Sequence, residues 1–386
     1  MMKRALLAVA AVSIVLGGCN WIKNLGKKDN VAKPTELVEF APTATVTRLW
    51  TASIGKGAGK SGARMQPAVN GDRVYVASVD GKLQVLDAGN GRRLWSIDEK
   101  KMPFSGGPAS NGDLVVVGTL DGRVKAYSAQ DGSERWQALI DSEVITAPAV
   151  AADLVVVRSQ DGRLYGFNPV DGERRWVYEQ AVPVLSLRGN STPLIDGGLV
   201  INGYDSGRLV AVQAADGAPV WNQSLSVAEG RTEVERLADA DGAIVLDGGV
   251  LFAAAYRGQI AALDASNGSL IWNRDLSSYA GVAVGPASVV VSDAEGNVLA
   301  FDRQNGANLW KQDGLLNRWL SGPAVVGGYV VVGDLEGYVH WLNIADGSFA
   351  AREKLGKKPI EGTPVVAGDV VFVEDVAGNI GAFRSE

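Results

Sequence analysis

A short block of residues returns along the chain at nearly even spacing, and this periodicity constrains the fold more than any other feature. Each of the eight copies begins Gly-x-aliphatic; seven continue to Asn-Gly or Asp-Gly with its glycine ten positions on, and six of these have Trp four positions later. Successive copies start 38 to 51 residues apart. A period near 40–45 residues is typical of a β-propeller. The copies begin at Gly81, Gly122, Gly162, Gly207, Gly258, Gly296, Gly337 and Gly378.

Within each copy the residues favour short strands joined by tight turns. Residues 114–117 are Leu-Val-Val-Val, which suits a strand, and the chain then reaches Asp121-Gly122. Residues 82–86 alternate between polar and apolar, as a half-buried strand does. Asn-Gly and Asp-Gly tolerate the positive φ that hairpin turns require. The 48 glycines therefore mark turns, and the predicted fold class is all-β.

The two ends of the chain each carry part of one repeat. The eighth copy stops at Glu386 without its last strand or its Trp, whereas residues 45–50 form a strand-like segment that ends in Trp50 with no repeat before it. Joining the two parts completes a blade and removes the open sheet edges. We therefore predict one eight-bladed β-propeller of four-stranded antiparallel blades, closed by the N-terminal strand pairing with the C-terminal blade.

The recurrent tryptophan is expected to fill the wedge between neighbouring blades, because a large ring at one fixed place in each sheet meets the next sheet. A ligand cage is the alternative, but rings repeated once per blade face their neighbours more readily than one shared pocket. The seventh copy departs from the pattern and has Ala351 instead. The predicted structural tryptophans are Trp50, Trp95, Trp136, Trp176, Trp221, Trp272 and Trp310.

The N-terminus resembles a bacterial lipoprotein signal. Lys3 and Arg4 precede an apolar run that is too short to span a bilayer, and the run ends in Leu-Gly-Gly-Cys at Cys19. A signal peptide that merely contains a Cys is the alternative. We predict a signal peptide at 1–18, a lipidated N-terminus and flexible tether at 19–44, and a single propeller at 45–386. Asn20 after the Cys implies an outer-membrane location facing the periplasm.

The amino-acid composition argues against several kinds of catalytic, metal and nucleic-acid-binding site. One Cys and one His leave zinc sites and Ser-His or Cys-His catalysis without their usual residues, and a formal net charge of −6 argues against nucleic-acid binding. We therefore expect no enzyme activity, no cofactor and no metal. His340, in a strand-like segment, is expected to be structural.

The two longest intervals between repeat tryptophans contain the candidate binding residues. Leu185, Leu187 and Arg188 lie in one interval, and Asp239 and Asp241 lie in the next. Insertions of this kind map to loops on one face of a propeller. Apolar side chains beside a guanidinium suit a protein interface. Three alternatives remain open: the leucines as a buried strand pair, the aspartates as turn formers, and Arg188 paired with an aspartate.

The turn-and-Trp segments, such as residues 129–136 and 214–221, resemble the repeat of quinoprotein dehydrogenases, which bind pyrroloquinoline quinone and Ca²⁺. The chain lacks the adjacent cysteine pair that many of them carry. The lipoprotein signal that ends at Cys19, the chain length and the eight repeats together resemble the BamB family of outer-membrane protein assembly factors. This resemblance covers essentially the whole chain. This resemblance implies that Leu185, Leu187 and Arg188 contact the periplasmic POTRA domains of BamA. It also implies that Asp239 and Asp241 touch that partner or hold the loop. A quinone-dependent dehydrogenase or a small-ligand-binding propeller is the alternative.

Overall fold

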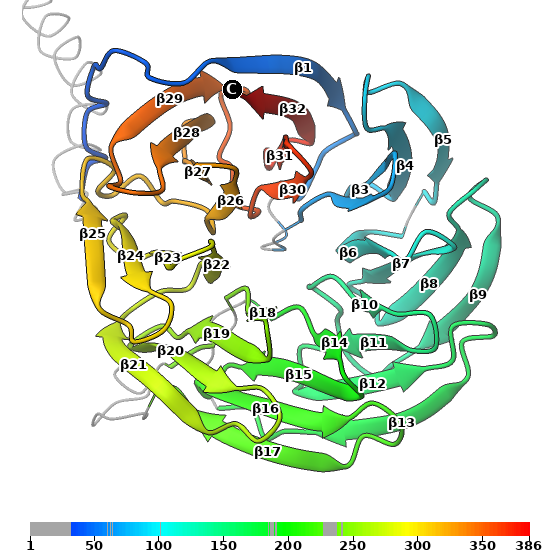
Figure 1. The fold of residues 1–386 in the computed structure, drawn as a ribbon. Coiled ribbons are helices and arrows are strands. Elements are labelled where there is room, and N and C mark those ends of the chain that lie inside the picture. Colours follow the sequence, from blue (N-terminus) through cyan, green and yellow to red (C-terminus); the bar gives the residue numbers. More distant parts are fainter. Residues whose placement is uncertain are drawn as a thin grey trace, which may run out of the picture. The chain divides into compact units, whose positions relative to one another are not determined.

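The structure is a computed structural model that describes residues 32–386 apart from 60, 62, 64, 101, 184, 186–188, 190, 227–237 and 241. Within these residues all regular secondary structure is β-strand, in eight sheets of four antiparallel strands. The sheets follow one another around a ring (Figure 1). The predicted all-β, eight-bladed propeller is thereby confirmed.

Blades 1 to 4 follow the order of the repeat, and their strands are given from the centre of the ring outwards (Figure 1). Blade 1 contains β2 (Ala68–Asn70), β3 (Arg73–Ala77), β4 (Lys82–Asp87) and β5 (Arg93–Asp98). Blade 2 contains β6 (Phe104–Ser110), β7 (Leu114–Thr119), β8 (Arg123–Ser128) and β9 (Glu134–Leu139). Blade 3 contains β10 (Ala149–Val150), β11 (Val155–Arg158), β12 (Arg163–Phe167) and β13 (Arg174–Glu179). Blade 4 contains β14 (Leu194–Asp196), β15 (Leu199–Tyr204), β16 (Arg208–Gln213) and β17 (Pro219–Ser224).

Blades 5 to 8 complete the ring in the same order. Blade 5 contains β18 (Val245–Asp247), β19 (Val250–Ala254), β20 (Gly258–Asp264) and β21 (Leu270–Leu276). Blade 6 contains β22 (Val282–Val284), β23 (Ser288–Ser292), β24 (Val298–Asp302) and β25 (Asn308–Gln312). Blade 7 contains β26 (Ala324–Val326), β27 (Tyr329–Gly333), β28 (Tyr338–Asn343) and β29 (Phe349–Lys354). Blade 8 contains β30 (Val365–Ala367), β31 (Val370–Glu374), β32 (Asn379–Ser385) and, outermost, β1 (Val46–Ser53).

The second and fourth strands of a blade differ in burial, and their sequences differ accordingly. β7 in blade 2 is apolar and buried along nearly its whole length, because neighbouring blades cover both of its faces. β9, the outermost strand of the same blade, begins with two exposed residues and buries Trp136. Its other positions are mostly exposed. One side of the outer strand thus packs on a neighbouring blade while the other meets solvent.

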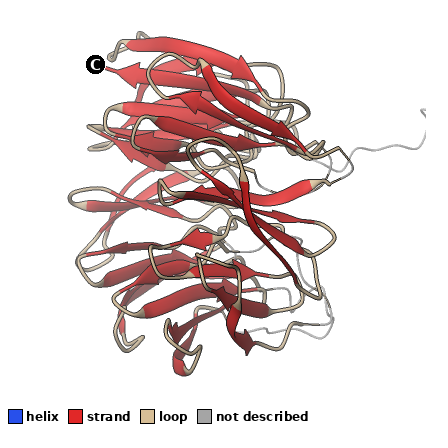
Figure 2. Cartoon of the chain, turned by 90° about the vertical axis from the view of Figure 1, so that its right-hand side faces the viewer, coloured by secondary structure: helices blue, strands red, loops and turns tan. Residues whose placement is uncertain are grey.

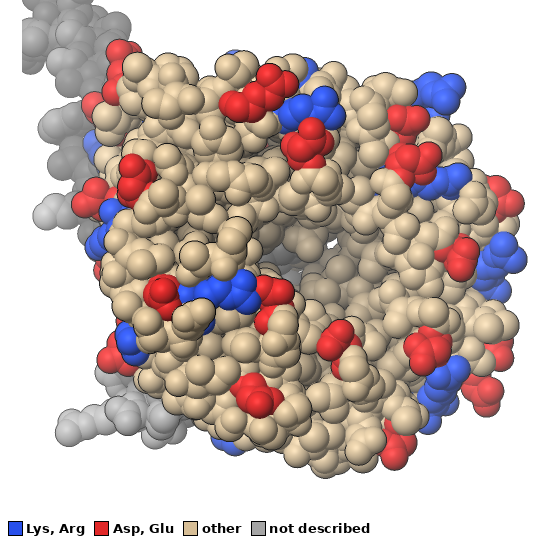
Figure 3. Space-filling model, in the orientation of Figure 1, with Lys and Arg blue, Asp and Glu red and all other residues tan. Residues whose placement is uncertain are grey.

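The alternating strand directions give the ring two different faces. Turns between the first and second strands, and between the third and fourth, lie on one face, here called the turn face. Turns between the second and third strands, and the connections between blades, lie on the opposite loop face; Figure 2 shows the ring from the side. Figure 3 shows the turn face, which is hollowed at its centre and has acidic and basic side chains interspersed around its rim.

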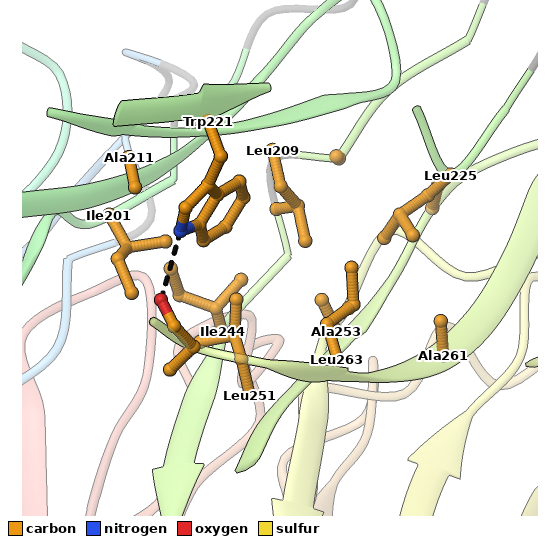
Figure 4. Packing of buried hydrophobic residues seen from close by; sticks show 13 residues of the cluster. Ile201, Leu209, Ala211, Trp221, Leu225, Ile244, Leu251, Ala253, Ala261 and Leu263 are labelled. Carbon is orange, nitrogen blue, oxygen red and sulfur yellow. Dashed lines mark hydrogen bonds between the residues drawn. The ribbon is translucent and has the colours of Figure 1, made fainter. Parts of the chain in front are cut away.

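Each of seven tryptophans on outermost strands joins its blade to the next one. Trp221 donates its indole Nε1–H to the carbonyl of Ala265 at 2.9 Å and packs among the aliphatic side chains between blades 4 and 5 (Figure 4). Its ring also covers Gly268, where a Cβ atom would lie 2.7 Å from the indole. The equivalent bonds, at 2.8–3.0 Å, run from Trp50 to Ala88, Trp95 to Ala129, Trp136 to Pro169, Trp176 to Ala214, Trp272 to Arg303 and Trp310 to Ile344.

Blade 7 lacks this tryptophan because the next blade lacks the turn that would receive it. The third and fourth strands of blade 8 are the two ends of the chain, so no Gly turn connects them. Ala351 occupies the tryptophan position, and Trp341 stands opposite it on β28. In blade 7 the large residue of this cross-strand pair thus lies on the third strand and the small one on the fourth, the reverse of the arrangement in most other blades. Trp341 is fully buried and meets Phe383 of blade 8 edge-on, with ring centroids 5.8 Å apart.

The ring closes where β1 pairs antiparallel with β32. The register runs from Val46 opposite Ser385 to Ser53 opposite Asn379, with one irregularity between Arg48 and Trp50. Beyond the strands, Thr45 and Glu386 exchange two backbone hydrogen bonds, of 3.2 and 2.9 Å. The two chain ends thus stand where the other blades have a covalent turn.

Residues 35–44 lie against the propeller, although the sequence predicts a flexible tether through residue 44. Thr35 N–H donates to the Leu316 carbonyl at 3.0 Å, and Arg352 Nη1 donates to the Val38 carbonyl at 3.1 Å. Ala44 is buried in the cluster that contains Ala351. The small side chain of Ala351 leaves room there, which gives the N-terminal segment a place to pack.

Candidate partner-binding loops

Two connections on the loop face contain the predicted binding residues. The first joins β13 to β14 and the second joins β17 to β18, so they flank blade 4. Each carries the chain from the outermost strand of one blade to the innermost strand of the next.

The two loops meet at the end of β15. A Cβ atom on Gly203 would lie 2.0 Å from the carbonyl oxygen of Ala240 and 3.4 Å from Cβ of Ser191. Ala240 belongs to the second loop and Ser191 to the first. Any side chain at position 203 would therefore displace the second loop, and glycine permits the close approach. Sequence reasoning predicted neighbouring loops but did not identify Gly203 as their meeting point.

Backbone hydrogen bonds hold the second loop between two blades. Ala240 N–H donates to the Tyr204 carbonyl in blade 4 at 3.1 Å, and Tyr256 N–H donates to the Asp239 carbonyl at 2.6 Å. Asp239 also forms an isolated antiparallel bridge with Tyr256. The Asp239 residue is only 4% exposed. Its side chain therefore lies inside the loop rather than on the surface.

Leu185 is the predicted apolar contact that the structure describes. It lies outside any strand and is 41% exposed. Leu187, Arg188 and Asp241, like the predicted lipidation residue Cys19, lie outside the described residues. Of the two predicted leucines, the structure thus describes one, Leu185, and its side chain is exposed to solvent.

Below this junction lies a buried ion pair that sequence reasoning missed. Arg158, the last residue of β11, donates from Nη2 to Asp205 Oδ1 at 3.3 Å, and both side chains are almost fully buried. The Arg158 guanidinium also lies 4.5 Å from the centroid of the Tyr204 ring. The sequence feature that indicated a buried charge was the position of Arg158 directly after the apolar run Val155-Val156-Val157.

This buried cluster adjoins the second loop, because the Tyr204 carbonyl accepts the hydrogen bond from Ala240 N–H. A buried ion pair is costly to break, because one charge is then left without a partner in a medium of low polarity. Burial also raises the pKa of the Tyr204 phenol, which therefore stays neutral. On the other side, the Thr146 and Thr192 hydroxyls are 3.0 Å apart and tie the first loop to the preceding interblade connection.

The described residues contain no group of three or more His, Cys, Asp and Glu placed to hold a metal ion. In the same part of the chain, no helix has the length and apolarity to cross a membrane. Near Gly203, the described part of the second loop is held to blades 4 and 5 by backbone hydrogen bonds.

Comparison with known proteins gives the family. A family model described as outer membrane protein assembly factor BamB matches residues 35–103, 84–312 and 296–386. The outer membrane protein assembly factor BamB of Xanthomonas campestris is 42% identical, over 100% of this chain and 98% of that protein.

Solved structures agree with the architecture. The crystal structure of BamB from Moraxella catarrhalis has a TM-score of 0.81 and 28% identity, over 88% of this chain and 100% of that chain. A europium-containing methanol dehydrogenase has a TM-score of 0.72 at 15% identity, over 90% of this chain and 95% of that chain, which is a likeness of fold alone. By its sequence along the whole propeller, the chain belongs to the BamB family of outer membrane protein assembly factors.

Proposed function

We propose that this protein is a non-enzymatic scaffold of outer-membrane β-barrel assembly, attached to the membrane through a lipid on Cys19 and facing the periplasm. Its membership of the BamB family supports the assembly role. In this proposal it binds the POTRA domains of BamA, orients them, and assists the insertion of unfolded β-barrel substrates.

The proposed contact surface is the junction of the two loops beside blade 4. The observation that carries it is the convergence of both loops on Gly203 above the buried pair of Arg158 and Asp205. The described part of the second loop is held to blades 4 and 5 by backbone hydrogen bonds, and a surface fixed before binding loses less conformational entropy when the partner arrives. We assign Leu185 to the contact and Asp239 to support of the loop, because Leu185 is exposed and Asp239 is buried. Leu187 and Arg188 complete the proposed contact, and Asp241 belongs to the same loop as Asp239.

Substitution of Leu185 tests this surface. We expect Leu185→Asp and Arg188→Glu each to reduce co-purification of BamA at least tenfold, since a charge replaces an apolar contact or reverses a cation. Val170→Asp is the matched control, because Val170 is 80% exposed and follows β12 in a turn on the opposite face. Thermal unfolding of all three variants should match that of the parent. Undiminished BamA binding by both loop variants would contradict the assignment.

A quinone-dependent dehydrogenase shares the fold, and a direct assay separates it from the proposed scaffold. Pyrroloquinoline quinone and Ca²⁺ are added to the purified protein, and absorbance and dye reduction with alcohols and sugars are measured. We expect no stoichiometric spectral change and no turnover. Substrate-dependent dye reduction would contradict the non-enzymatic role.

A further inference from the structure

Trp319 stands apart from the other tryptophans. It lies on the loop face, in the connection between β25 and β26, and it is 64% exposed. The other tryptophans in the described part of the chain are buried or half-buried. An indole ring left in water loses the burial that makes tryptophan stabilising, so its exposure needs a reason.

The backbone around Trp319 adopts a conformation that a bulky residue rarely takes. Trp319 has φ 49° and Asn317 has φ 57°, both in the left-handed region. Such strain persists only where the surroundings enforce it, and it concentrates at sites of function. Here Asn317 N–H donates to the Glu295 carbonyl at 2.8 Å, and Leu335 N–H donates to the Arg318 carbonyl at 3.0 Å.

The two neighbours of Trp319 in sequence are buried and fix the ring outwards. Leu320 is 4% exposed and belongs to the apolar core between blades 6 and 7. Arg318 is 2% exposed, donates from Nε to Asp334 Oδ2 at 2.8 Å, and also pairs with Glu336. Trp319 is therefore a single aromatic side chain held outside a rigid loop.

The same loop is where the N-terminal segment reaches the propeller. Thr35 N–H donates to the Leu316 carbonyl at 3.0 Å, and Arg318 Nη1 donates to the Thr35 carbonyl at 2.9 Å. Fifteen residues separate Cys19 from Thr35. A stretch of this length reaches about 55 Å when fully extended and roughly 20 Å on average when flexible. A lipid on Cys19 would therefore keep this loop close to the bilayer.

We propose that Trp319 inserts into the interfacial zone of the phospholipid leaflet that carries the Cys19 anchor, and so forms a second membrane contact. This inference rests on the lipid anchor of the proposed function. Tryptophan favours the membrane–water interface, where its ring is partly apolar and its N–H stays hydrated. The tether makes this contact intramolecular at an effective concentration that reaches the millimolar range, so weak intrinsic affinity is sufficient.

A lipid surface suits this side chain better than a protein partner does. A stable protein interface buries about 800 Å² on each side and needs a patch of side chains, whereas both neighbours of Trp319 in sequence are buried. A fluid interface accepts a single ring. The chain is acidic, with a formal net charge of −6, so general attraction to anionic lipids does not assist, and the contact should depend little on salt.

Quenching by brominated lipid tests the insertion. The lipidated full-length protein is reconstituted into vesicles of phosphatidylethanolamine and phosphatidylglycerol, with or without lipids brominated near the headgroup. We expect parent fluorescence to be quenched more than that of Trp319→Phe, and the difference to persist at high salt. Trp310→Phe is the matched control, because it removes an indole that is 8% exposed and should leave the quenched component unchanged. Equal quenching of the parent and Trp319→Phe would overturn the proposal.

A label at the same position separates lipid from protein. A fluorophore on Trp319→Cys should be shielded from iodide in vesicles alone, while one on Val170→Cys should stay accessible. Shielding at position 319 that appears only after BamA is added would assign Trp319 to a protein partner and overturn the lipid contact. Flotation of the vesicles reports anchoring separately, so failure of the Cys19 anchor is distinguishable from failure of the Trp319 contact.

Discussion

Glu374, the last residue of β31, is a buried carboxyl group. Among the residues that the structure describes, neither of its oxygens has a hydrogen-bond partner, and the residue is 4% exposed. It borders a narrow cavity lined by Ala58, Ala63 and Met65 together with Glu361, Gly362, Asp375 and Val376. Burial, together with the negative charge of Asp375, raises the pKa of Glu374 from 4.5 to about 8. The carboxyl is therefore mainly neutral at pH 7.

This shift predicts how stability changes with pH. Below pH 4.5, Glu374 is protonated in both the folded and the unfolded state. Between about pH 4.5 and 8 the unfolded chain releases the proton while the folded chain keeps it, so the Glu374 contribution lowers the free energy of unfolding as pH rises. The slope is at most about 1.4 kcal/mol per pH unit. Glu374→Gln should remove this contribution, so its stability gain over the parent should grow from pH 5 to pH 8.

Urea unfolding at pH 5, 6.5 and 8 measures the effect. Glu361→Gln is the control for the loss of one carboxyl group, because Glu361 borders the same cavity but is exposed. A difference between Glu374→Gln and the parent that stays constant with pH would show that Glu374 does not titrate in this window.

At the scale of the blade, one pair of positions recurs on the third and fourth strands. In most blades Ala or Gly on the third strand stands opposite the tryptophan, as Ala211 does opposite Trp221 and Ala262 opposite Trp272, whereas blade 1 has Val85 opposite Trp95. The tryptophan then covers the turn glycine of the next blade. Packing between blades therefore depends on three positions: the residue opposite the tryptophan, the tryptophan itself, and the turn glycine of the next blade. This dependence explains why the tryptophan and the glycine recur together in the sequence.

A double-mutant cycle tests this dependence at the junction of blades 4 and 5. Trp221→Ala should cost about 3–5 kcal/mol of stability. Gly268→Ala should also destabilise, because its Cβ would lie 2.7 Å from the Trp221 ring and its φ is +72°. In the Trp221→Ala background the clash disappears and only the backbone strain of about 1–2 kcal/mol remains. The two effects should therefore be less than additive, and additive values from urea unfolding would refute the coupling.

At the scale of the whole molecule, the ring is closed by strand pairing between the chain ends. Thr45 and Glu386 exchange two hydrogen bonds, and such a pair has Cα atoms about 5.5 Å apart. A two-residue Asn-Gly turn is the usual link across such a pair. The closure is therefore a hairpin that lacks only its covalent turn.

A circular permutant tests this closure. Glu386 is joined to Thr45 through Asn-Gly, residues 1–44 are removed, and new ends are placed between Asp141 and Ser142 on the loop face. We expect a folded ring with cooperative thermal unfolding, since the link preserves the register of β1 and β32. Adding Ala351→Trp with Trp341→Ala should now be tolerated better than in the parent, because a turn glycine is again present. The control is the unpermuted chain without residues 1–44, because residues 35–44 pack on the propeller; a permutant that fails to fold while this control folds would contradict the interpretation of the ends as a hairpin.

The sequence alone determined the number of blades, the order of strands and the closure of the ring. These follow from local chemistry, because turn glycines, β-branched strands and periodic tryptophans each act over a few residues and recur at a fixed period. The departure at Ala351 was also visible in the sequence, but its reason, the missing turn in blade 8, required the paired chain ends.

The tertiary structure decided which polar side chains are buried and where distant loops meet. The sequence predicted a contact role for Leu185 and left Asp239 as either a contact or a support of the loop; in the structure Leu185 is exposed and Asp239 is buried. The pairing of Arg158 with Asp205 and the packing of residues 35–44 on the propeller also depend on contacts between segments far apart in the chain. The repeat pattern predicts the average surroundings of each position in a blade. Burial of one particular side chain depends instead on the individual residues that the closed ring places next to it.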